Sequence, residues 1–177
     1  MRVCIFLVVL ILTGCSGSFT ENSSVESATG YIGLTEWQNR AELTAFMGID
    51  PSRTEWCAAF VNAVLELDNI PSLNDSRHPA PLSARSFLSW GERIAPKNIK
   101  KGDLVIFPRG SQEGWQGHVG FYVETVIKNG HDQYLILGGN QSNSVRYDLF
   151  NPKRALGVRR WTADTIIDPS LMIASLR

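Results

Sequence analysis

The stretch EWCAAFVNAVLEL, residues 55–67, carries the clearest secondary-structure pattern of the chain. Its apolar residues recur at spacings i, i+3, i+4, i+7 and i+8, which places them on one face of a helix. They are Cys57, Phe60, Val61, Val64 and Leu65. Thr54 can cap this helix, which would put Cys57 in the first turn, at about the third helical position. We therefore predict a helix over residues 55–67 whose apolar face packs on the rest of the domain.

Outward from this helix, the two halves of the chain differ in their patterns. The front half predicts two more helical segments, over residues 36–47 and 83–90. The back half predicts strands, because short apolar runs and alternating residues surround Asn129-Gly130, a strong signal for a tight turn. The predicted strands cover residues 103–107, 118–127, 134–137, 145–149 and 155–161. Helices followed by an antiparallel sheet predict an α+β domain.

The N-terminus has the composition of a secretory leader. Met1 and Arg2 give a positive start, and an apolar run over residues 3–12 leads to Thr13-Gly14-Cys15. The run is about half as long as a transmembrane helix requires. Leu12 to Cys15 resembles the bacterial lipobox, in which the leader is removed and the cysteine becomes the lipidated first residue. The alternative is a plain secretory signal that happens to contain a cysteine.

These features divide the chain into three parts. Residues 1–14 are the predicted signal peptide, and residues 15–29 are a lipidated Cys15 with a flexible tether rich in serine and threonine. Fully stretched, such a tether reaches roughly 50 Å. Residues 30–177 form the single predicted domain, with 44% hydrophobic and 19% charged residues over the whole chain, as in ordinary globular proteins. Basic and acidic residues balance at 17 each, so bulk charge gives no reason to expect nucleic-acid binding.

Cys57 is the only thiol left free in the mature chain. Cys4 leaves with the leader and Cys15 would be acylated, so an intrachain disulfide is excluded. Cys57 is then either a small buried hydrophobe or a reactive thiol. At a helix start, free N–H groups and the helix dipole favour a thiolate, which predicts a lowered cysteine pKa.

His118 is the histidine best placed to activate that thiol as a general base. On a strand, it would share one face with Gly120 and Tyr122, and Gly120 leaves room for a close approach. His131 lies in the predicted turn and His78 in a polar loop. The alternative is a structural histidine at the surface.

An amide side chain is expected to orient the imidazole. A two-residue turn at Asn129-Gly130 pairs His118 with Gln141, whereas a bulge at Gly138-Gly139 would bring Asn140 onto that face instead. The sequence does not decide between these registers. Either amide oxygen could accept a hydrogen bond from the second ring nitrogen, as the third member of a Cys-His-Asn triad does.

Five motifs in order, TEWCAAFVN, SARSFLSWG, KKGDLVIF, GHVGFY and LGGNQ, resemble the CHAP-type branch of the papain-like cell-wall hydrolases, which is related to the NlpC-type peptidases. The resemblance covers roughly residues 30–161. It implies a papain-like α+β fold in which the nucleophile begins a helix that packs on the sheet bearing the histidine. By motif, Cys57 is the nucleophile, His118 the base and Asn140 the third residue, although many members carry a glutamate near that third position.

The same resemblance implies the function, which is cleavage of an amide bond in peptidoglycan by acyl transfer, with the Cys57 N–H in the oxyanion hole. The enzyme would be an N-acetylmuramoyl-L-alanine amidase or a peptidoglycan endopeptidase. Alternatives are a non-catalytic lipoprotein that binds peptidoglycan, and a same-fold amidase with another substrate, including a toxin. Trp115 and Gln141 are the candidate substrate-binding residues, although Trp115 could instead anchor its loop. Glu55 either assists the site or balances the helix dipole.

These assignments predict the cofactors, the partners and the location of the protein. We find no metal-ligand spacing and no phosphate loop, and therefore expect no cofactor. The expected partners are peptidoglycan and, through the lipid on Cys15, a membrane, with no nucleic acid and no second copy of the chain. Ser16 after the anchor favours the outer membrane, facing the periplasm, if the host is Gram-negative.

Overall fold

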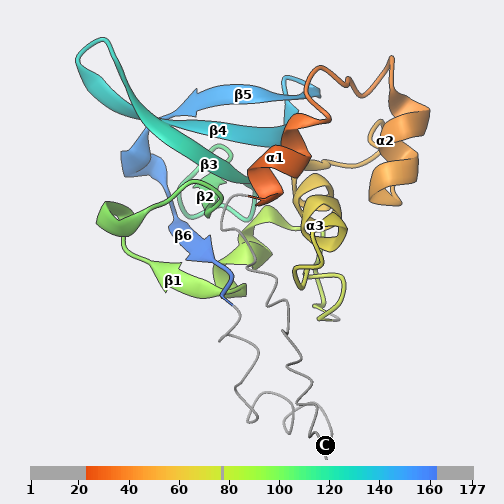
Figure 1. Ribbon diagram of the computed structural model, residues 1–177, viewed down its shortest axis with the longest axis horizontal. Coiled ribbons are helices and arrows are strands. Elements are labelled where there is room, and N and C mark those ends of the chain that lie inside the picture. Colours follow the sequence, from red (N-terminus) through yellow and green to blue (C-terminus); the bar gives the residue numbers. More distant parts are fainter. Residues whose placement is uncertain (1–22, 77, 163–177) are drawn as a thin grey trace, which may run out of the picture.

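The helices come first along the chain and the strands follow, so the predicted α+β class is confirmed. The computed structural model describes residues 23–76 and 78–162 (Figure 1). The predicted leader, the anchor at Cys15 and residues 163–177 lie outside the described residues. In chain order the elements are α1 (Ser23–Thr29), α2 (Arg40–Met47), α3 (Cys57–Leu67), the 3-10 helix η1 (Ala84–Ser89), β1 (Glu92–Ile94), η2 (Pro96–Asn98), β2 (Leu104–Pro108), β3 (Gly117–Lys128), β4 (His131–Gln141), β5 (Ser144–Phe150), η3 (Pro152–Arg154) and β6 (Gly157–Arg160).

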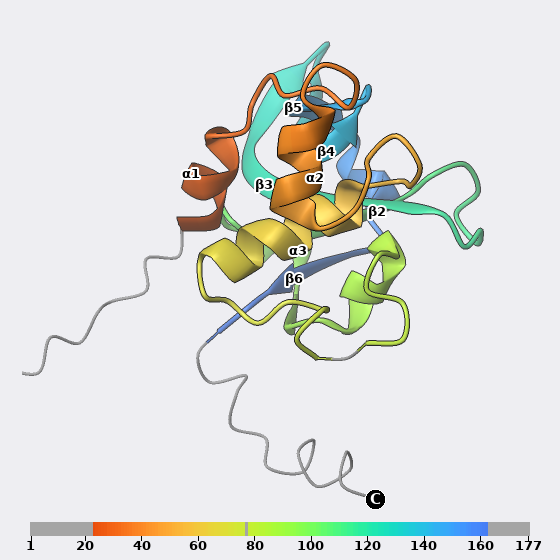
Figure 2. The same cartoon turned by 90° about the vertical axis from the view of Figure 1, so that its right-hand side faces the viewer.

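One antiparallel sheet runs through the molecule in the order β1-β6-β2-β3-β4-β5. The helices α1, α2 and α3 gather on one side of it, and α3 contacts both β3 and β4 (Figure 1, Figure 2). The long β3–β4 hairpin turns at Asn129 and Gly130, which both have positive φ (54° and 73°) as a type I′ turn requires. The predicted tight turn is confirmed.

The helix α3 is buried on almost all sides rather than on one face. From Cys57 to Leu65 every residue is buried, and Asn62 among them bonds the Pro81 carbonyl and the Leu73 N–H. The helix begins at Cys57, so the cysteine is the first helical residue and not the third. Thr54 is not its cap, because Trp56 occupies that position without a side-chain cap bond. Trp56 is fully buried and donates its indole N–H to Glu36 Oε2 at 3.1 Å, so packing fixes where the helix begins.

The prediction of a flexible tether up to residue 29 is wrong for its second half. Ser23–Thr29 is the helix α1, and Val25 and Ala28 are 2% and 0% exposed in the main core. These two apolar residues stand three apart, which is enough for one face of a two-turn helix even in a serine-rich segment. Ser27 also donates to Asp68 at the end of α3. The packed domain therefore starts at or before residue 23.

Two hydrophobic clusters lie on the two faces of the sheet. The larger is formed with the helices and includes Val119, Phe121 and Leu137 from β3 and β4. The smaller lies on the opposite face, where β2, β3, β4 and β6 curve around it; its members are Val105, Phe107, Tyr122, Tyr134, Ile136 and Val158. Alternate residues of β3 thus point into different clusters, as the period of two requires.

Two predicted helical segments differ in detail. The segment 36–47 is helical only from Arg40, and Trp37 before it is 67% exposed. The segment 83–90 is a 3-10 helix, whose buried Ala84 and Phe87 stand three residues apart as that helix allows.

Candidate active site

Cys57 lies at the N-terminal end of α3, where this helix meets β3. Its residue surface is only 3% exposed. The backbone N–H groups of Val119, from β3, and of Ala58, from the first turn of α3, lie near the sulfur and favour a thiolate. The Arg109 guanidinium adds a positive charge nearby. The sulfur is therefore surrounded by groups that favour a thiolate, inside an otherwise apolar environment.

Burial nevertheless raises the pKa of the Cys57 thiol above its ordinary value. Arg109 and the two N–H groups act in the opposite direction but do not outweigh the loss of solvation. The expected lowering of this pKa by the helix start is thus wrong in direction. The reason is that the helix start lies under the sheet rather than at the surface, so at neutral pH the resting group is a thiol.

His118 comes from the start of β3 and is 3% exposed. Its Nε2 and Gln141 Oε1 are 2.9 Å apart, and its ring stacks on Phe150 with centroids 5.3 Å apart and an interplanar angle of 11°. Gln141 in turn donates to the Ile136 and Arg146 carbonyls. Because the amide nitrogen is engaged there, the Gln141 oxygen accepts the proton of Nε2–H. The proton therefore sits on Nε2 and leaves Nδ1 as the basic nitrogen.

Among the described residues, no group hydrogen-bonds His118 Nδ1, although the atom is buried. The pKa of His118 is lowered to about 4: burial is the largest cause, the bond to Gln141 acts against it, and the charge of Arg109 adds to the lowering. The imidazole is therefore neutral at pH 7. A buried, unpartnered basic nitrogen is unusual in a folded protein and marks a site that exchanges a proton or binds a ligand.

Cys57 and His118 are brought to the same point of β3 without bonding to each other. The backbone N–H of Val119, the next residue after His118, lies near the sulfur. Val119 packs in the cluster with α3, whereas the His118 ring stacks on Phe150, which packs against the opposite cluster. Catalytic hydrogen bonds are often formed only once substrate is bound. The thiol and the imidazole are thus both neutral and point toward different sides of β3.

The register of the β3–β4 hairpin explains which amide reaches His118. Near the turn the pairing is the predicted one, from Lys128↔His131 to Glu124↔Leu135. An extra residue in β3, between Tyr122 and Glu124, shifts the register by one. A second irregularity, between Gly138 and Gln141, adds a residue to β4 relative to β5. Gln141, the partner that the unshifted hairpin predicts, is the amide that contacts His118.

Asn140 does not contact His118, contrary to its expected place as the third residue. Its backbone is left-handed, with φ 57°, and its side chain points to Glu55, where Nδ2 and Oε2 are 2.7 Å apart. Arg109 completes the group, because it pairs with Glu55 and donates to the Asn140 carbonyl at 2.9 Å. Arg109 was missed by the sequence analysis; its signal was a charged residue directly after a fully buried strand.

A pocket of about 320 Å³ opens beside Cys57. It is lined by Thr54, Glu55, Cys57, Leu82, Ser83, Ala84, Arg109, Trp115, Gln116 and Gly117. Trp115 is 81% exposed, so it does not anchor its loop. Arg85 does, by donating to the carbonyls of Gln116 at 3.0 Å and Gln112 at 2.9 Å. Trp115 is thus presented at the pocket mouth, free to stack on a ligand.

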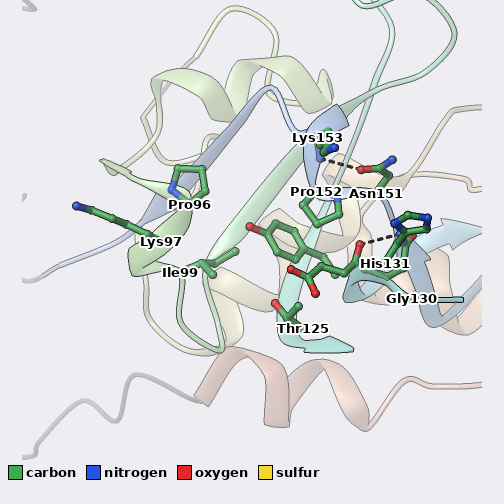
Figure 3. A pocket seen from close by; sticks show the side chains of 12 residues that line it. Pro96, Lys97, Ile99, Thr125, Gly130, His131, Asn151, Pro152 and Lys153 are labelled. Atoms are coloured by element: carbon green, nitrogen blue, oxygen red, sulfur yellow. Dashed lines mark hydrogen bonds between the residues drawn. The ribbon is translucent and has the colours of Figure 1, made fainter. Parts of the chain in front are cut away.

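A larger hollow of about 800 Å³ lies elsewhere, between the β3–β4 turn and the segments around Pro96 and Pro152 (Figure 3). Tyr134 and His131 line it, but none of the predicted site residues does. Its size alone does not make it the active site, because it contains neither a thiol nor a buried unpartnered base.

The described residues show no triplet of His, Cys, Asp or Glu arranged to hold a metal. Within the same residues, no helix has the length and apolar character needed to cross a membrane.

Comparison with known proteins identifies a fold rather than a family. Neither a family model nor a curated protein matches the chain. A Staphylococcus aureus protein, similar to lipoprotein of the NLP/P60 family, has a structure that matches with TM-score 0.51 and 17% identity, over 81% of this chain and 41% of that one. The P60 domain of an M. avium paratuberculosis antigen matches with TM-score 0.40 and 20% identity, over 60% of this chain and 63% of that domain. This chain thus spans less than half of the first structure.

At this level of identity the likeness is one of architecture. The fold is a papain-like α+β domain, with a helix that begins at a cysteine and packs on an antiparallel sheet. What the domain does has to be argued from its own residues.

Proposed function

We propose that this protein is an NLP/P60-type cysteine hydrolase that cleaves an amide bond of peptidoglycan, with Cys57 as nucleophile and His118 as base. The observation that carries the proposal is the Cys57 sulfur at the helix start beside an open pocket, together with a buried histidine on the adjoining strand β3 that has one nitrogen unpartnered among the described residues. The architecture shared with an NLP/P60 protein supports it.

The chemistry follows from the neutral state of both groups. The thiol attacks the amide carbonyl while its proton passes to His118 Nδ1, so no preformed ion pair is needed. Because the two side chains make no contact in the structure, this transfer requires the thiol and the imidazole to come together when substrate binds. The negative charge that develops on the carbonyl oxygen is stabilised by the Cys57 N–H, a free donor at a helix start. The imidazolium then protonates the leaving amine. Water, deprotonated by the same nitrogen, releases the acyl group from sulfur and restores the thiol.

Gln141 takes the role for which Asn140 was expected, because its oxygen is the one that contacts His118 Nε2. It fixes the tautomer with Nδ1 unprotonated and supports the imidazolium when it forms. Asn140, through Glu55, belongs instead to the mouth of the pocket. Trp115 supplies an exposed aromatic surface there for a sugar ring or a peptide.

We further propose export and lipidation at Cys15, with peptidoglycan as the partner of a monomeric, membrane-anchored enzyme. The lipobox-like Leu12 to Cys15 supports the anchor. The S. aureus structure belongs to a protein similar to lipoprotein, which agrees with it. Metabolic labelling with a fatty-acid probe tests the anchor, because Cys15→Ala should abolish incorporation.

Digestion of purified peptidoglycan tests the activity. Wild type should release soluble fragments, whose masses name the bond that is cut, whereas Cys57→Ala and His118→Asn should release none. Thr54→Ala, on the same pocket wall, serves as a control that keeps the thiol and the base. Fragment release by Cys57→Ala at the wild-type rate would overturn the proposal.

A second candidate is a lipoprotein that binds the wall without turning it over. The 3% exposure of Cys57, and the lack of a bond between its thiol and the His118 imidazole, favour it. Sedimentation of protein with insoluble peptidoglycan, without fragment release and unaffected by Cys57→Ala, would support this function instead.

A further inference from the structure

The hollow of about 800 Å³ beside the β3–β4 turn lies on the face of the sheet that carries the smaller cluster, away from α3. Residues 130–134 of the hairpin form one side of it, and the 3-10 helices η2 and η3 form the others. Figure 3 shows Pro96 and Lys97 of η2 on a different side from Pro152 and Lys153 of η3. Each proline restricts the backbone at the start of its helix, so each wall presents a lysine from a defined position.

Tyr134 lines this hollow with a hydroxyl group that no described residue hydrogen-bonds. The residue is only 6% exposed. Its neighbour Tyr122, with ring centroids 5.1 Å apart, has its own hydroxyl 2.8 Å from Thr125 Oγ1. Burial raises the pKa of Tyr134, so its hydroxyl stays protonated at neutral pH and is able to donate and to accept. Because buried polar groups nearly always have a partner, this unpaired hydroxyl is a group that a ligand in the hollow would bind.

Three charged side chains around the hollow also have no hydrogen bond or ion pair with any described residue. They are Asp132, Lys97 and Lys153. Asp132 lies close enough to Tyr134 to contribute to the raised pKa of that residue. The Lys153 backbone N–H donates to Asn151 Oδ1 at 2.9 Å, which leaves the amide NH2 of Asn151 as a donor. The hollow thus combines two free cations with a carboxylate, a hydroxyl and an amide.

This combination of groups discriminates between classes of ligand. A polyphosphate would pair with the two lysines but would be repelled by the Asp132 carboxylate. A neutral sugar would hydrogen-bond Asp132 and Tyr134 but leave both lysines unpaired. A sugar that carries carboxylates satisfies both sets, because its hydroxyls donate to Asp132 while its carboxylates accept from the lysines. The rings of Pro96 and Pro152 offer apolar contacts to the C–H faces of such a sugar.

We propose that this hollow is a second binding site of the protein, for an acidic saccharide, which is a chain of sugars that carry carboxylates. Its volume of about 800 Å³ lies within the range of pockets that enclose small ligands. The inference goes beyond the proposed function, because the hollow shares no lining residue with the pocket beside Cys57 and lies on the other face of the sheet from α3.

Calorimetry at low salt with the full chain tests this site. The probes are tetramers of galacturonic, mannuronic and guluronic acid, and the methyl ester of each, which keeps the ring hydroxyls and removes the charge. We expect at least one acid to bind about tenfold more tightly than its ester. Lys97→Gln combined with Lys153→Gln should remove this preference. Lys128→Gln changes an exposed lysine of the same hairpin outside the hollow and, as the matched control, should keep it.

Two further variants distinguish a sugar site from a general anion site. Tyr134→Phe keeps the ring and removes only the hydroxyl, so it should weaken binding of acid and ester alike by about fivefold. It should leave thermal unfolding unchanged, because that hydroxyl has no partner among the described residues. Asp132→Asn should weaken binding as well, whereas at a general anion site it would tighten binding by removing a repelling charge.

The outcomes are distinct. No binding of any acid at millimolar concentration, equal affinity for acid and ester, unchanged binding by Tyr134→Phe or tighter binding by Asp132→Asn would overturn this site. If peptidoglycan is not cut but acid binding depends on Tyr134, the hydrolase proposal fails while this inference stands. If peptidoglycan is cut and no acid binds, only this inference fails.

Discussion

Protonation of His118 should make the protein lose stability as the pH falls, in a window set by its buried ring. Burial lowers the pKa of His118 from an ordinary 6.5 to about 4, against a smaller rise from the Gln141 bond and with a further lowering by Arg109. The unfolded chain therefore takes up a proton near pH 6.5, and the folded protein only near pH 4. The stability that the neutral His118 contributes is fully present above its pKa in the unfolded chain. It is lost as the pH falls toward and through its pKa in the folded protein.

The size of the effect follows from the same shift. While only the unfolded state carries the extra proton, the free energy of unfolding falls by about 1.4 kcal/mol per pH unit. Across the interval from 6.5 to about 4, this amounts to about 3 kcal/mol. Such a loss is a large part of the stability of a typical domain.

Urea denaturation at a series of pH values from 7.5 to about 4.5, within the range where stability follows proton uptake, measures this slope for wild type and for His118→Asn. The variant lacks the ring stacking and part of the hydrogen-bond network at every pH, which lowers its free energy of unfolding by a constant amount. It should also lack the dependence of this free energy on pH that His118 causes. The difference in free energy of unfolding between the two proteins should therefore shrink as the pH falls. Carboxylates that titrate below this window affect both proteins equally and cancel in the difference.

His131→Asn is the matched control, because His131 is exposed at the β3–β4 turn. It should keep the wild-type slope. Parallel pH profiles for wild type and His118→Asn would refute the reasoning, since they would mean that the His118 ring is protonated in the folded protein as readily as in the unfolded chain.

Three further changes test the packing around the site by urea denaturation or calorimetry. Gln141→Leu removes the hydrogen-bond partner of the imidazole and of two buried backbone carbonyls. It should lower the free energy of unfolding by about 3 kcal/mol. Val25→Ala should lower the free energy of unfolding by about 2 kcal/mol, because the side chain is 2% exposed. Glu26→Ala, on the exposed side of the same helix, should lower it by less than about 0.5 kcal/mol. Equal effects of the two substitutions would mean that this segment is a flexible tether after all. Gly139→Ala would place a Cβ 2.6 Å from the side chains of α3 and its cap residue and should cost about 1 to 3 kcal/mol, while Gly114→Ala, with no contact under 3.4 Å, should be near neutral.

The helix at residues 55–67 could be predicted because its apolar spacing is long and regular, but its start could not. Local capping rules pointed to Thr54, whereas the buried Trp56 and its bond to Glu36 determine the first turn. That bond joins residues 20 positions apart, which no local pattern contains. The helix α1 was not predicted for a related reason. Two apolar residues among serines indicate a helix only when there is a core for them to pack against.

The site was predicted in its parts and not in its electrostatics. Strand alternation and a tight turn limit which residues can meet, and they predicted the contact between His118 and Gln141 as one of two alternatives. Sequence pattern could not give the direction of the Cys57 pKa shift, which depends on how deeply the sheet covers the helix start. Nor could it give the two register shifts, one between β3 and β4 and one between β4 and β5, because both depend on contacts between strands that no local pattern contains.

The consecutive glycines of LGGNQ show how the site and the fold are built from the same residues. A Cβ at Gly138 would come within 3.2 Å of Gln141 Oε1 and 3.5 Å of His118 Nε2, on the side of the imidazole. A Cβ at Gly139 would meet Trp56 and Phe60 at 2.6 Å, on the side of α3. One glycine therefore lets the amide reach the base, and the next lets β4 approach the helix that carries the thiol. Because successive residues of a strand point to opposite faces, two adjacent positions must both lack a side chain for His118 and Gln141 to meet on one face while α3 packs closely on the other.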